Sequence, residues 1–84
     1  MTDRFACSCC GYLTLPRKSP GSLEICDVCF WQDDMVGFNR PNIAIGPNAV
    51  SLIDARQNYR RFGACEQRFI QDVRRPRPEE QPAS

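Results

Sequence analysis

Two Cys-x-x-Cys pairs constrain this chain more than any other feature of its sequence. The pairs are Cys7 with Cys10 and Cys26 with Cys29, and fifteen residues lie between them. Two intervening residues allow a tight turn to bring both sulfurs of a pair to one side, and this spacing between pairs is typical of zinc sites. The pattern therefore predicts four sulfur ligands arranged tetrahedrally around one Zn²⁺.

The size of the chain makes such a metal useful. It has 84 residues, seven prolines and 42% apolar residues, which is enough for one domain with a thin core. A metal held by thiolates contributes on the order of 10 kcal/mol to folding at neutral pH. Because four protein ligands fill the coordination sphere, we expect one structural zinc per chain. Iron in the same cage and a disulfide framework are the alternatives.

The expected compartment bears on the choice between metal and disulfides. Residues 1–6 begin with charges and contain no apolar run of signal-peptide length, and no stretch approaches the roughly 20 apolar residues that span a bilayer. We therefore expect a cytoplasmic protein without membrane contact. In a reducing cytoplasm, six cysteines indicate metal ligands rather than disulfides.

Two cysteines lie outside the pairs. Cys9 falls inside the first pair and Cys65 comes late in the chain. Either is a possible alternative ligand, and Cys9 next to a metal is also a candidate reactive thiol. The simpler expectation is that Cys9 fills the turn and that Cys65 is a small buried residue, because reactive thiols need a specific electropositive setting.

The pattern of apolar and turn residues predicts a small metal-stabilised α+β fold. Residues 12–15 and 23–25 favour strands, and the Pro/Gly/Ser-rich residues 16–22 between them indicate a hairpin loop. Residues 35–36 and 43–45 allow only short extended pieces. A helix is expected from Ser51 as N-cap to Gly63 as C-terminal stop, followed by a shorter helix within 65–73. The architecture is a zinc-ribbon-like hairpin with two cysteine turns and one or two C-terminal helices.

The end of the chain has a different composition. Residues 74–84 carry three prolines but no aromatic or branched aliphatic residue, so we expect a disordered tail. The predicted domain therefore covers residues 1–73 and the tail covers 74–84.

Further motifs extend the pattern of the cysteine pairs. Gly11 follows the first pair, Trp31 and two aspartates follow the second, and the helix segment reads Ser-Leu-x-x-Ala-Arg-x-Asn-Tyr-x-x-Phe-Gly. With these motifs, residues 5–69 resemble the bacterial cysteine-rich CPCC family. Ser8, Asp27, Phe30 and Gln32 stand where that family usually has Pro, Pro, Gly and Glu. The resemblance implies a zinc-ribbon-like domain and no reaction, since the family is of uncharacterised function.

We expect no catalysis and no small-molecule substrate. The chain lacks histidine, and its thiols therefore have no histidine partner to activate them. Asp33 and Asp34 are adjacent carboxylates, which we expect to be solvated in a turn or paired with Arg56 or Arg60.

The leading hypothesis is a zinc-stabilised module that binds another protein, as an inhibitor or regulator. Aromatic and arginine side chains dominate binding hot spots, so the candidate contacts are Phe30, Trp31, Phe38, Arg56, Arg60 and Arg61. A nucleic-acid-binding zinc ribbon that uses the Arg-rich C-terminal helix is the first alternative, although the net charge is only +1. A rubredoxin-like iron electron carrier is the second.

Overall fold

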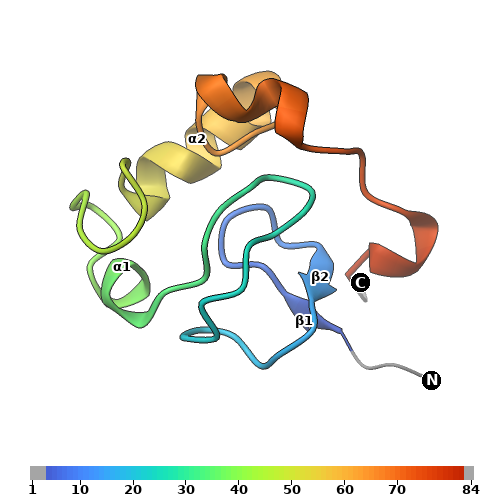
Figure 1. The fold of residues 1–84 in the computed structure, drawn as a ribbon, viewed down its shortest axis with the longest axis horizontal. Helices are drawn as coiled ribbons and strands as arrows, with labels where there is room; N and C mark the ends of the chain where they lie inside the picture. Colours follow the sequence, from blue (N-terminus) through green and yellow to red (C-terminus); the bar gives the residue numbers. More distant parts are fainter. Residues whose placement is uncertain (1–3, 83–84) are drawn as a thin grey trace.

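The computed structural model describes residues 4–82 (Figure 1). In this view the short two-stranded sheet lies below the central loops, the helix at Leu52–Phe62 lies above them and the helix at Met35–Asn39 lies at the left. The fold is therefore a small α+β domain. Its elements are β1 (Phe5–Ala6), β2 (Leu13–Leu15), α1 (Met35–Asn39), α2 (Leu52–Phe62) and two 3₁₀ helices, η1 (Gln67–Asp72) and η2 (Pro78–Glu80).

The hairpin is not the one that the sequence predicts. β2 pairs antiparallel with β1, with Phe5 opposite Leu15, and not with residues 23–25. The expected pairing is wrong because the first cysteine turn itself closes a hairpin between residues 6 and 13. Residues 23–25 instead lie beside the residues after the second pair: the Leu23 amide donates to the Asp33 carbonyl at 2.7 Å.

α2 confirms the longest predicted helix. The Ser51 hydroxyl accepts the Asp54 amide at 3.1 Å, and this cap satisfies one of the free N–H groups at the helix start. Gly63 ends the helix in the left-handed conformation, at φ 87°, with its N–H on the Tyr59 carbonyl. Leu52 and Ala55 are buried, so this side of α2 faces the core. The shorter helix expected within 65–73 is the 3₁₀ helix η1.

α1 replaces the extended piece expected at residues 35–36. The Asp34 side chain accepts the amides of Val36 at 3.0 Å and Gly37 at 2.9 Å, and so acts as the N-cap of this short helix. An aspartate at this position favours a helix start over a strand because it satisfies two free N–H groups at once. The prediction missed this cap.

The core is small and built largely around sulfur. Its large buried side chains are Trp31, Leu15, Leu52 and Val28, and five of the six cysteines are buried with them. Trp31 is 1% exposed. A core with so few large side chains supplies little stabilisation of its own.

Residues 74–82, which the sequence predicts as the start of a tail, fold back toward β2 in the structure (Figure 1). The Arg74 guanidinium donates two hydrogen bonds to the Glu80 carboxylate, at 2.8 and 2.7 Å, and the Glu80 side chain is 3% exposed. The Arg77 amide also donates to Glu80, and the Arg74 amide donates to the Asp27 carbonyl. Arg74 therefore satisfies the buried Glu80 carboxylate, whereas the composition of these residues predicts that this carboxylate is in water. The predicted tail's last residues, 83–84, lie outside the described residues, as do residues 1–3 of the predicted domain.

Glu80→Gln is expected to lower the free energy of unfolding at pH 7 by about 1–3 kcal/mol, because a neutral amide leaves the Arg74 charge without its partner. Arg74 lowers the pKa of Glu80 from 4.5 to about 2. The folded carboxyl is thus the stronger acid, so its contribution is complete above pH 4.5 and is lost as the pH falls from 4.5 toward 2. Denaturant titrations of the metal-loaded protein should show the full difference between wild type and variant at pH 7 and down to the pH at which acid releases the metal.

The matched control is Glu79→Gln, which removes the neighbouring exposed carboxylate. It should leave the free energy of unfolding within about 0.5 kcal/mol of wild type. Equal losses in the two variants would contradict the role assigned to the buried pair.

Candidate metal centre

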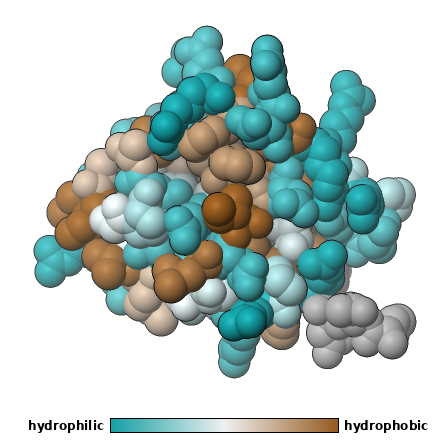
Figure 2. All heavy atoms as spheres, viewed as in Figure 1, coloured by the Kyte–Doolittle hydropathy of each residue, from teal (hydrophilic) through white to brown (hydrophobic). Residues whose placement is uncertain are grey.

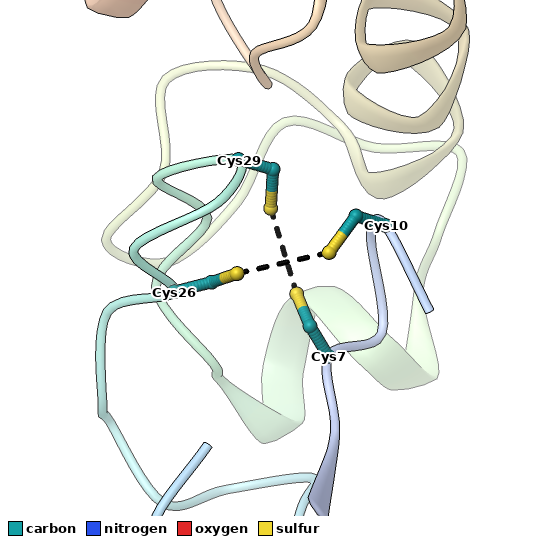
Figure 3. A group of neighbouring side chains, drawn as sticks. All are labelled: Cys7, Cys10, Cys26 and Cys29. Carbon is teal, nitrogen blue, oxygen red and sulfur yellow. Dashed lines mark hydrogen bonds between the residues drawn. The ribbon is translucent and has the colours of Figure 1, made fainter. Parts of the chain in front are cut away.

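The four paired cysteines point their sulfurs at one common centre (Figure 3). All four sulfurs lie within 4.8 Å of one another, with Cys7 and Cys29 3.5 Å apart and Cys10 and Cys26 3.7 Å apart. Four sulfurs bound tetrahedrally to zinc at about 2.3 Å stand about 3.8 Å apart. The described residues therefore provide a four-sulfur group placed to hold a metal ion.

The first cysteine turn, residues 7–12, is built by its backbone. The Cys7 amide donates to the Tyr12 carbonyl and the Gly11 amide donates to the Cys7 carbonyl, both at 2.9 Å. Gly11 has φ 83°, a conformation in which glycine carries no steric penalty. The Cys9 amide points at the Cys7 sulfur, 3.4 Å away. Sequence spacing predicts this turn well because the backbone leaves little alternative.

The second cysteine turn, residues 26–31, repeats the first bond for bond. The Cys26 amide donates to Trp31, the Phe30 amide donates to Cys26, and the Val28 amide points at the Cys26 sulfur. Phe30 takes the place of Gly11 and has φ 71°, which is uncommon for a residue with a side chain. Its ring packs on Phe69 of η1 with the ring centres 4.6 Å apart. The contact explains how a phenylalanine is kept where the turn favours glycine.

α2 and the residues after it hold both turns in place. The Arg56 side chain of α2 donates to the Ser8 carbonyl in the first turn at 2.9 Å. The Cys65 amide donates to the Cys29 carbonyl in the second turn at 2.8 Å, and Asn58 of α2 in turn donates to the Cys65 carbonyl at 2.9 Å. Both halves of the sulfur group are thus fixed to one helix.

Thr14 on β2 adds a hydrogen bond to the sulfur group. Its hydroxyl lies 2.9 Å from the Cys26 sulfur, and its side chain is buried. The thiols of Cys10 and Cys29 also hydrogen-bond to Cys26. These bonds lower the pKa of Cys26, and the bond from Cys10 has the larger effect. A hydroxyl directed at a sulfur stabilises its negative form. Sequence reasoning missed Thr14, Asn58 and the role of Arg56; only the alternation along 12–15 gave a signal for Thr14.

The same crowding opposes ionisation of Cys10 and Cys29. Hydrogen bonding with Cys26 raises the pKa of Cys10, and hydrogen bonding with Cys10 raises the pKa of Cys29. Sulfurs this close do not all carry negative charge unless a cation lies among them. The donor set therefore fits a soft divalent cation and releases protons when it binds one.

Cys9 and Cys65 lie outside the four-sulfur group. Cys9 is 8% exposed and occupies the position in the first turn that Val28 occupies in the second. Cys65 is fully buried, and burial raises the pKa of its thiol to about 12. All six cysteines lie within the described residues and are free of disulfides.

The candidate interaction residues occupy different environments. Trp31 is buried and so presents no surface, Phe30 packs on Phe69, and Arg56 is bound to the first turn. Phe38, Arg60 and Arg61 are exposed.

The two adjacent aspartates differ from the expectation. Asp33 is 1% exposed and accepts three hydrogen bonds, from the Ser19 hydroxyl and from the amide and hydroxyl of Ser22. Asp34 caps α1 and is also buried. The expected solvation or pairing with Arg56 or Arg60 is wrong, because serine and backbone donors satisfy both carboxylates locally.

The motifs that surround the sulfur group extend over almost the whole chain. The family model described as cysteine-rich CPCC matches residues 5–80. The chain belongs to the cysteine-rich CPCC family. The match takes in both cysteine turns, α2 and the Arg74–Glu80 pair of this CPCC chain, so the family covers the C-terminal residues that fold back on β2. No curated protein matches this chain.

None of the helices in residues 4–82 is long and apolar enough to cross a membrane.

Proposed function

We propose that this CPCC chain is a non-catalytic module, held in its fold by one structural zinc ion on Cys7, Cys10, Cys26 and Cys29, that acts by binding another protein. The observation that carries the proposal is the convergence of four sulfurs from two matching turns in a domain with a minimal core. Without a metal, so small a core would not stabilise the fold by itself.

The nature of the donor set supports zinc in a structural role. Four thiolates suit zinc or iron, and a full set of four protein ligands leaves no position for water or substrate. Zinc bound there supplies a fixed link between two turns that are distant in sequence. Thr14 and the turn amides stabilise the charge on the sulfurs, and Arg56 and Cys65 hold the turns in position.

Protein binding is favoured over nucleic-acid binding by the way the arginines are used. Arg56 is committed to the Ser8 carbonyl, Arg68 pairs with Glu66, and Arg74 pairs with Glu80. These contacts leave fewer free cations for phosphates. Exposed apolar side chains on α1 and in the loop after it supply the contact area that a protein partner needs.

Metal analysis of the purified protein tests the proposal. We expect one zinc per chain in a colourless protein, and loss of the circular dichroism signal when a strong chelator removes the metal. A coloured protein with one iron per chain would favour the electron carrier. A chain that keeps its fold without metal would overturn the proposal.

A further inference from the structure

The apolar side chains of this chain are divided unevenly between interior and surface. Four large ones form the core, whereas nine in the described residues expose 38% or more of their surface. Single exposed apolar residues are ordinary, but a contiguous group of them marks an interaction site. A chain with so small a core gains no stability from leaving large apolar side chains in water.

Six of the nine belong to α1 and to the residues that follow it up to the start of α2. The Ile53 amide donates to the Pro41 carbonyl at 2.8 Å, so the start of α2 lies against the loop after α1. Figure 2 shows apolar side chains gathered at the left of the view, where Figure 1 places α1 and this loop. We name this group the α1 face; its members are Met35, Val36, Phe38, Ile43, Ile45 and Ile53.

The area of the α1 face is large enough to form most of an interface with a partner of similar size. Each member exposes between 38% and 47% of its surface. Together these six residues expose about 500 Å², which lies toward the upper end for a patch on a monomer and forms the greater part of the roughly 800 Å² that one side of a standard interface buries.

Two charged residues next to the α1 face decide which partner it fits. Arg40 follows α1 and Asp54 follows Ile53, and both are exposed. Neither takes part in the ion pairs found within residues 4–82. A twofold interface sets the same surface against itself, so residue i of one copy meets residue j of the other and the reverse. A rim with one cation and one acid is complementary to itself, whereas a rim of one sign repels its own copy.

We propose that two copies of this chain pair through the α1 face about a twofold axis, with Arg40 of one copy opposite Asp54 of the other. This dimer supplies a partner for the interaction module proposed above and rests on that proposal for the folded, metal-bound chain. The metal lies outside the contact surface and holds the fold that presents it.

Sedimentation equilibrium of the metal-loaded full chain tests the dimer. The fitted mass should rise with concentration from that of one chain to twice that value. Phe38→Asp places a charge within the α1 face and should weaken association at least about tenfold. Ile70→Asp is the matched control, because Ile70 is 41% exposed but lies on η1; it should associate like wild type. Circular dichroism should show both variants folded.

A charge exchange tests the register. Arg40→Asp and Asp54→Arg should each weaken the dimer, and the double variant should restore it. A double variant that stays monomeric overturns the Arg40–Asp54 pairing, and equal losses in Phe38→Asp and Ile70→Asp overturn the α1 face as the interface.

Wild type that remains at the mass of one chain with a full complement of metal overturns the dimer while leaving the structural metal intact. A monomer that binds lipid vesicles or another protein through Phe38 would also overturn the dimer and leave the structural metal intact. A metal-free chain that stays folded and dimeric overturns the proposed function and leaves the dimer standing.

Discussion

Replacing Cys7, Cys10, Cys26 or Cys29 singly with serine is expected to release the metal and unfold the chain at neutral pH. A serine oxygen is a poor ligand for a soft cation, and a four-thiolate site contributes on the order of 10 kcal/mol to folding. Small domains are stable by only about 5–15 kcal/mol in total, so little remains once the site is lost. Metal content per chain and the far-ultraviolet circular dichroism signal measure the two effects together.

The other two cysteines provide the control. Cys9→Ser and Cys65→Ser should keep one metal per chain and lower the free energy of unfolding by about 1–2 kcal/mol, the effect of placing a hydroxyl in a buried site. Cys9→Val should be tolerated better still, because Val28 fills the matching position in the second turn. If Cys65→Ser releases the metal while Cys10→Ser retains it, the assigned ligand set is wrong.

Asp33→Asn is expected to lower the free energy of unfolding by about 2–4 kcal/mol, because an amide places an N–H₂ group against donors from Ser19 or Ser22 and leaves buried polar atoms without partners. The Asp33 carboxylate is buried and accepts three hydrogen bonds, two of them on one oxygen. Denaturant unfolding of the metal-loaded protein at pH 7 measures the change.

Asp34→Asn is the matched control for that substitution. Asn remains a good N-cap but has one acceptor oxygen in place of two, so the variant keeps only one of the bonds to Val36 and Gly37. It should lose about 1 kcal/mol, less than Asp33→Asn. Similar small losses of unfolding free energy in both variants would contradict the buried role of Asp33 and favour the solvated turn that the sequence predicts.

The parts of the fold that the sequence predicts are those set by local rules. The cysteine spacing predicts the two turns, and Ser51 and Gly63 mark the ends of α2, because each of these features depends on neighbouring residues. The sequence does not reveal which strand β2 pairs with, because residues 5–6 are too short to show an alternating pattern. It also does not reveal that Arg56 reaches Ser8, 48 residues away, since no local signal specifies such a contact.

Composition misled the prediction at the C-terminal end and at the aspartates. Residues 74–82 have few apolar side chains to bury, yet one carboxylate with a bidentate arginine is packed there. Asp33 and Asp34 have the sequence context of surface charges, yet serines and backbone amides nearby satisfy them. In both places polar groups are satisfied by specific geometry, which depends on the tertiary structure and not on residue type.

The two cysteine turns also set an order in which the domain assembles during synthesis. All four sulfurs lie at or before Cys29, whereas α2, which packs across both turns, begins at Leu52. A growing chain therefore presents its complete donor set before the helix has left the ribosome. The proposed metal site would therefore be complete before α2 is available to dock against it.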